Sequence, residues 1–174
     1  MKIIQNTFAL LLVTLITFSC SSGDEGPSPA QTQTPASNYF FKAKIDGVQY
    51  TASAAQVLSG SSTDKITVTS VTSDNRNFEL QIVRPTGLGI YIYPAPAPAT
   101  ADYLLRMSYG DASSATAIWR IGTCASTTSG NVTITALSAT EISGTFSFIG
   151  KRTSSCSDPA KQIAEGSFKS QITQ

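Results

Sequence analysis

The sequence predicts an all-β fold, either an antiparallel β-sandwich or a small barrel of about 9–10 short strands. Three observations support this fold class. Short runs of alternating apolar and polar residues lie between clusters of turn residues. Only 13% of the residues are charged, and Thr, Ser, Ala and Gly are abundant, which favours strands and turns over exposed helices. No window of a dozen residues combines a helical period with good helix formers.

The first expected element is a hairpin over residues 40–52 (FFKAKIDGVQYTA), because Asp46-Gly47 at its corner tolerates the left-handed backbone of a tight turn. Ser-Asp-Asn, Pro-Thr-Gly, Gly-Asp and Ser-Asp-Pro clusters separate the later strands. Three prolines make residues 94–100 (PAPAPAT) an extended connector. The further strands are expected at residues 65–71, 78–84, 89–93, 103–109, 115–121, 131–138, 141–150 and 162–172.

Residues 1–19 have the pattern of a signal peptide. Lys2 gives a positive start, and the apolar run from Phe8 to Phe18 is too short to span a bilayer, which needs about 20 residues. Ser19-Cys20 then resembles the lipobox of bacterial lipoproteins, in which cleavage before the cysteine leaves a thiol that carries diacylglycerol. The alternative is an ordinary secretory signal whose cleavage site lies beside Cys20.

Cys20 and the residues up to 38 form the second predicted region, a lipidated cysteine followed by a disordered tether. Ser21 to Asn38 contains no large apolar side chain and three prolines, so it cannot bury enough surface to fold. Residues 39–174 form the single predicted β domain. The expected location is the outer membrane, held through the N-terminal lipid. Asp24 and Glu25 resemble an export signal for the outer leaflet, or they are ordinary acids of a solvated tether, so the leaflet stays open.

Cys124 and Cys156 are expected to form a disulfide, because an even pair of cysteines in an exported domain usually does. Two free thiols are one alternative. Metal ligation is the other, but the chain has no histidine to complete such a site. If the last four strands form an up-and-down meander, the loops that carry the two cysteines emerge at the same end.

Three segments of the sequence stand out: FKAKIDGVQYTA at 41–52, SGNVTITALSATEISGTFSFIG at 129–150 and AEGSF at 164–168. They resemble a family of small Bacteroidota outer-membrane lipoproteins of unknown function. The domains of that family begin with Phe-x-Ala-x-(Ile/Val)-(Asp/Asn)-Gly and end with Gly-x-Val-x-Ile, Ile-Ser-Gly-x-Phe and Glu-Gly-x-Phe. The resemblance implies a lipid-anchored all-β domain and supplies no catalytic residues. The matching residues are Phe41, Ala43, Ile45, Asp46, Gly47, Gly130, Val132, Ile134, Ile142, Ser143, Gly144, Phe146, Glu165, Gly166 and Phe168. Gly144 and Gly166 inside strands indicate bulges or close backbone approach.

Composition argues against several classes of function. Without residues 1–19 the formal charge is zero, so there is no basic footprint for nucleic acid. Zero histidines exclude a Ser-His-Asp triad and histidine-based zinc sites. Ser62-x-x-Lys65 with Ser73-Asp74-Asn75 resembles part of the β-lactamase signature, but these residues are expected in turns. We therefore expect no catalytic residues, no metal, no cofactor and no enzymatic activity.

Aromatic residues are the best functional lead. Tyr91 and Tyr93 share one face of their strand, and Ile90 and Ile92 share the other. The candidate ligand platform consists of Tyr91, Tyr93, Tyr103, Tyr109 and Trp119, with Arg84, Arg106 or Arg120 at its rim. Such rings could stack on sugars, whereas the alternative is that they fill the core.

The resulting expectation is a non-catalytic binding or adhesion module on a lipid-anchored outer-membrane or cell-surface protein. Its partner would be a glycan or another protein. The alternative is a structural or assembly subunit of an outer-membrane complex, which would pack through an open sheet edge.

Overall fold

A computed structural model describes residues 38–94, 103–112, 117–124 and 127–173. The predicted signal peptide 1–19, Cys20 and the tether up to residue 37 lie outside the described residues, as do residues 95–100 of the proline-rich connector. In the described ranges, no helix has the length and apolar character needed to span a membrane. The all-β prediction is confirmed, and the antiparallel sheet is curved into a nearly closed barrel.

Eleven strands and one short 3-10 helix, η1, make up the described fold. The first half contains the β1–β2 hairpin, η1 and the strands up to β6, and the second half contains β7 to β11. The bounds are β1 Phe40–Ile45, β2 Val48–Ser53, η1 Ala54–Gln56, β3 Val57–Ser62, β4 Lys65–Val71, β5 Asn77–Val83, β6 Gly89–Tyr93, β7 Leu104–Gly110, β8 Ile118–Arg120, β9 Ser129–Leu137, β10 Glu141–Arg152 and β11 Lys161–Gln171.

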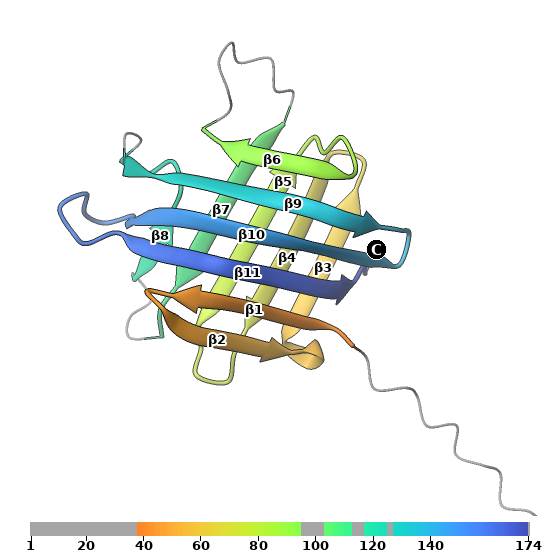
Figure 1. Cartoon of the computed structure of the whole chain (residues 1–174), viewed down its shortest axis with the longest axis horizontal. Coiled ribbons are helices and arrows are strands. Elements are labelled where there is room, and N and C mark those ends of the chain that lie inside the picture. The colour runs from red at the N-terminus through yellow and green to blue at the C-terminus, as the bar shows by residue number, and fades with distance from the viewer. Residues whose placement is uncertain (1–37, 95–102, 113–116, 125–126, 174) are drawn as a thin grey trace, which may run out of the picture. The chain divides into compact units, whose positions relative to one another are not determined.

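The strands form two layers that cross at a steep angle (Figure 1). One layer contains β2, β1, β11, β10, β9 and β6, and the other contains β8, β7, β5, β4 and β3. The long strand β10 connects them, since it pairs with β9 and β11 along most of its length and with β8 at Lys151 and Arg152. A bridge between Ser59 and Ile172 joins β3 to the chain just after β11.

The core lies between the two layers and is rich in aromatic rings. Phe78 is at its centre, with ring centroids 5.1 Å from Phe41, 5.0 Å from Tyr109 and 4.8 Å from Tyr50. Among the described residues, the buried apolar side chains run from Phe41 to Ile172, and both layers contribute to the core. Because the alternation of inward and outward residues is regular, most strand positions follow directly from the sequence pattern.

Two predicted features of the terminal strands are confirmed. Asp46 and Gly47 both have positive φ, +48° and +85°, as the tight turn between β1 and β2 requires. A bulge in β11 shifts the register between Phe146 and Phe148 of β10, and Glu165 at this bulge also has a positive φ of +50°. Close packing explains Gly166 next to it, because a Cβ there would lie 2.5 Å from the Phe146 carbonyl oxygen.

The predicted disulfide is present. Cys124 and Cys156 are bonded, with their Cα atoms 5.8 Å apart. The expected up-and-down meander of the last four strands is only partly correct. Strands β9, β10 and β11 are neighbours, but β8 pairs with β7 and with the end of β10 rather than with β9. The two loops still meet, because β8 lies across the end of β10 from which the second loop emerges.

Candidate functional site

The five-ring platform does not exist as one exposed surface. Tyr91 and Tyr109 are only 1% and 2% exposed, so the core alternative is correct for these two residues. Burial raises the pKa of Tyr109 to about 12, because an ionised phenol would be poorly solvated there. The opposite face of β6 is outward, so it is Ile90 and Ile92 that are exposed, at 63% and 41%.

The hydroxyl of Tyr91 explains why this residue faces inward. It donates a hydrogen bond to the carbonyl oxygen of Gly87 at 2.6 Å and accepts one from the amide of Thr86 at 3.0 Å. The apolar ring therefore packs in the core, while the hydroxyl forms hydrogen bonds with the backbone of the loop before β6.

Tyr103 and Trp119 are half-buried and have structural partners. The Tyr103 hydroxyl accepts a hydrogen bond from the Ile92 amide at 2.9 Å, on the free edge of β6. The Trp119 ring has the guanidinium of Arg152 at 5.8 Å and the ammonium of Lys161 at 5.5 Å. A groove of about 390 Å³ lies at this ring, but these two cations cover the surface on which a sugar would stack.

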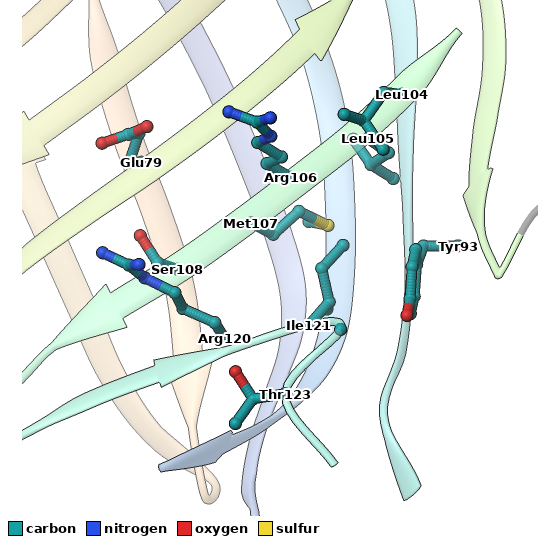
Figure 2. A pocket seen from close by; sticks show the side chains of 11 residues that line it. Glu79, Tyr93, Leu104, Leu105, Arg106, Met107, Ser108, Arg120, Ile121 and Thr123 are labelled. Atoms are coloured by element: carbon teal, nitrogen blue, oxygen red, sulfur yellow. The ribbon is translucent and has the colours of Figure 1, made fainter. Parts of the chain in front are cut away.

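A larger cleft, of about 510 Å³, opens beside β7 (Figure 2). It exists because β8 pairs with β7 only from Ser108 to Gly110, so the first half of β7 has no strand on that side within the described residues. The buried side chains of Leu105, Met107 and Ile121 form its apolar floor.

Tyr93 provides a wall of this cleft, at the end of β6. Its ring packs against the turn after β8, where a Cβ on Gly122 would lie 3.4 Å from the Tyr93 hydroxyl oxygen. Gly122 also has a φ of +81°, so glycine suits this turn both in conformation and in size. The wall is thus held by contact between β6 and the β8 turn, two segments distant in sequence.

The polar side of the cleft follows from strand register. Arg106 and Ser108 alternate on the outward face of β7, and Ser108 pairs with Glu79 of β5 on one side and with Arg120 of β8 on the other. Figure 2 shows the guanidinium groups of Arg106 and Arg120 on the same face as the Glu79 carboxylate. Thr123 adds a hydroxyl at the edge. Two cations and one carboxylate therefore line the cleft from the outward face of the sheet, while Leu105 and Met107 line it from the core face of β7.

Three of the residues named from the sequence meet in this cleft: Tyr93, Arg106 and Arg120. Arg84 does not line it. Glu79, Ser108 and Thr123 were not anticipated. Glu79 joins the site because β5 pairs with β7 although β6 lies between them in the sequence, and Thr123 joins it from the turn after β8. The alternation of polar residues in β5 and β7 was visible, but their shared register was not.

Metal ligation has no candidate in the described part of the chain, since no three His, Cys, Asp or Glu side chains cluster there. Ser62 and Lys65 of the β-lactamase-like motif face each other across the β3–β4 turn, where the Ser62 hydroxyl donates to the Lys65 carbonyl oxygen at 3.3 Å. These two residues are exposed strand ends that flank the turn, rather than residues of the turn itself.

Comparison with known proteins gives one match. The chain matches no curated protein and no solved structure. Residues 37–170 match a family described as "Domain of unknown function (DUF6252)", a range that begins just before β1 and ends one residue before the end of β11. The family therefore corresponds to the whole barrel, including the cleft and all three motif segments, and the chain belongs to the DUF6252 family.

Proposed function

We propose that this chain is a non-catalytic binding protein, anchored to the outer membrane through lipid on Cys20, whose ligand occupies the cleft between β7, β8 and Tyr93. The observation that carries the proposal is the cleft itself, which two guanidinium groups line from the outward face of the sheet and buried apolar side chains line from the core face. Its volume of about 510 Å³ lies within the 300–1,000 Å³ range of small-molecule sites.

The cleft has the composition of a recognition site. Leu105, Met107 and Ile121 offer apolar contact, while Arg106 and Arg120 offer directed hydrogen-bond donors that fix the orientation of a ligand. The polar groups come from three strands, β5, β7 and β8, and each strand is held by its pairing. Such a site is largely formed before the ligand arrives, which reduces the ordering cost of binding.

A binding role is favoured over catalysis by the acid–base groups at the cleft. Glu79 is the one carboxylate among the described residues that line it, whereas glycoside hydrolysis uses a pair of carboxylates. Arginine does not serve as a proton donor or acceptor near neutral pH. The lining can therefore hold a ligand, and it offers no acid–base pair for a reaction.

The anchor in this proposal comes from the sequence, where an apolar run of signal-peptide length ends at Ser19-Cys20. The three sequence segments resemble those of Bacteroidota outer-membrane lipoproteins and support the same location. The test is intact mass and detergent partition of the mature protein. We expect an N-terminal acylated Cys20 in the detergent phase, and a Cys20→Ser variant without acyl groups. Aqueous partition of the unaltered chain without acylation would contradict the anchor.

The binding part is tested with residues 21–174, which contain the whole core. Met107 is the one methionine in this segment and lies on the cleft floor, so a methyl-labelled sample gives a single methionine resonance that reports on the cleft. A panel of glycans and peptides is titrated. We expect at least one ligand to shift this resonance in a saturable manner. Ligands that bind without moving it would place the site elsewhere.

The second candidate function, assembly into an outer-membrane complex, is favoured by one observation. In the described residues, β2 pairs with β1 alone, and it carries an exposed Val48 and no charged side chain (Figure 1). Edge strands are usually protected by charges, proline or bulges, so an unprotected edge suits the addition of a partner strand. Val48→Lys and Thr51→Lys would abolish co-purification of such a partner and leave ligand binding at the cleft unchanged.

A further inference from the structure

We infer that the ligand of the cleft is a saccharide that bears a carboxylate group, and that Arg106 and Arg120 bind this carboxylate. The inference rests on the proposed function, because it assumes that the cleft is a ligand site. It adds the chemical class of the ligand and the residues that select it.

The two arginines are placed to act together. Arg120 pairs across the strands with Ser108, and Arg106 is two residues before Ser108 on the same face, so the two are diagonal neighbours. Diagonal positions in an antiparallel pair are roughly 7–8 Å apart, within reach of long side chains that converge on one group. Figure 2 shows both guanidinium groups extended along this face.

Neither guanidinium is neutralised by a carboxylate. Arg106 donates a hydrogen bond to the neutral amide oxygen of Gln81 at 3.4 Å, and within the described residues neither Arg106 nor Arg120 forms an ion pair. By contrast, Arg76 and Arg152 are paired with Asp74 and Asp158 at 2.8 and 3.0 Å. Two uncompensated cations on one face repel each other, and an anion bound between them removes that repulsion.

A carboxylate is favoured over a phosphate because of the charge of the cleft. Glu79 lies on the other side of Ser108, so the lining carries two positive charges and one negative charge. A net charge of +1 matches a monoanion, whereas the second negative charge of a phosphate monoester would face Glu79. The planar guanidinium fork also fits a carboxylate with two parallel hydrogen bonds.

A saccharide is favoured over an acidic peptide because the Glu79 carboxylate, beside the arginines, can accept hydrogen bonds from a ligand. Sugar hydroxyls adjacent to a carboxylate supply donors for such bonds, and an aspartate or glutamate side chain carries none beside its carboxylate. Ser108 and Thr123 add hydroxyl groups that both donate and accept. Leu104, which is 40% exposed and shares the outward face of β7 with Arg106, offers contact to the apolar C–H surface of the sugar ring.

The test titrates the Met107 methyl resonance of residues 21–174 with a galacturonate oligosaccharide and with its methyl ester, which has the same sugar and no charge. We expect saturable binding of the acid and affinity at least ten-fold weaker for the ester. Arg106→Gln and Arg120→Gln should each weaken the acid at least ten-fold. Arg84→Gln is the matched control, since Arg84 is exposed outside the cleft, and should stay within two-fold. Thermal unfolding checks that each variant is folded.

The possible failures are distinguishable. Equal affinity for the acid and the ester, with Met107 shifting in both, would overturn the inference and leave the proposed function intact. A polyglutamate peptide that binds as tightly as the acid, with the same loss in the arginine variants, would make the ligand an acidic peptide and also overturn it. If no glycan or peptide shifts Met107, the proposed function fails together with the inference.

Discussion

The ring of Phe146 on β10 lies directly over the Cα atom of Gly166 on β11. A Cβ atom at Gly166 would lie 2.5 Å from the Phe146 carbonyl oxygen and 2.6 Å from two atoms of its ring. Phe146 in turn packs on Phe41, with ring centroids 4.9 Å apart. The glycine of the terminal Glu-Gly-x-Phe motif therefore provides space for a central ring of the core.

Gly166→Ala should lower the free energy of unfolding by about 1–3 kcal/mol, because the added methyl group forces the ring or the strand to move. Equilibrium denaturation in urea measures this. Gly60→Ala is the matched control in β3, where the nearest atom to a new Cβ is 3.8 Å away. That variant should be neutral or slightly more stable, by up to about 1 kcal/mol. Equal effects at the two positions would contradict the packing explanation.

Reduction of the disulfide should lower stability and weaken binding at the cleft together. Cys124 and Cys156 are 32 residues apart, so the bridge restricts a loop whose closure entropy corresponds to about 3–4 kcal/mol. Cys124 directly follows Thr123, which lines the cleft. We expect the Cys124→Ser, Cys156→Ser double variant to remain folded, to unfold at lower urea concentration, and to bind a cleft ligand more weakly. Unchanged affinity would show that the bridge does not position this loop.

Tyr103→Phe should open the free edge of β6. It removes the hydroxyl that accepts a hydrogen bond from the Ile92 amide at 2.9 Å and donates one to the Ile92 carbonyl oxygen at 3.4 Å. The expected loss of stability is about 0.5–1.5 kcal/mol, with faster hydrogen exchange at the Ile92 amide. Tyr39→Phe is the control, since its hydroxyl has no hydrogen-bond partner among the described residues. Unchanged exchange at Ile92 in Tyr103→Phe would contradict this role.

Acid should destabilise the domain partly through Asp46. Burial disfavours its charged form, but hydrogen bonds from Lys161 and the Gln162 amide, with the charge of Lys161, bring its pKa below the ordinary value of 3.8. A lowered folded pKa contributes stability that is present above pH 3.8 and is lost as the pH falls through the folded value.

Unfolding experiments between pH 5 and about pH 2.5 measure this contribution. Asp46→Asn keeps a residue that tolerates the positive φ of the turn and should show a smaller loss of stability over this range. Lys161→Met should reduce the pH dependence in the same direction, because it removes the partner of the charged form. A pH dependence that is unchanged in both variants would rule out this pair as its source.

Most strands were predictable because their inward and outward residues alternate. The expected ranges 65–71 and 89–93 coincide with β4 and β6, and β10 begins at Glu141 as predicted. β3 was missed because its inward face carries Ser59, which is 3% exposed, so the segment lacks an apolar alternation. β8 was predicted over 115–121; residues 115 and 116 lie outside the described residues, and in the described part of this range strand pairing covers Ile118–Arg120.

The site was only partly predictable, because alternation gives the face of a residue and not its partner. The prediction that Tyr91 and Ile90 lie on opposite faces of their strand is confirmed. Because both side chains are largely apolar, the sequence did not indicate which of the two points into the core. The sequence analysis placed Arg106 and Arg120 at the rim of the aromatic platform. It did not indicate Glu79, which lies at the site because β5 pairs with β7. That pairing requires β6 to leave the layer and join β9, and no local sequence signal marks such a change of partner.

The long strand β10 separates the point where the described chain enters the barrel from the cleft. The described chain enters the barrel at Phe40 of β1, which pairs with Lys169 of β11. Lys169 also pairs with Ser143, near the start of β10. The cleft lies near the other end of β10, where Lys151 pairs with Arg120 of β8 (Figure 1). The eight residue steps from Ser143 to Lys151 correspond to about 26 Å of strand. The point at which the described chain enters the barrel is therefore separated from the arginine-bearing cleft by most of the length of β10, so substitutions near Phe40 make no contact with the residues that line the cleft.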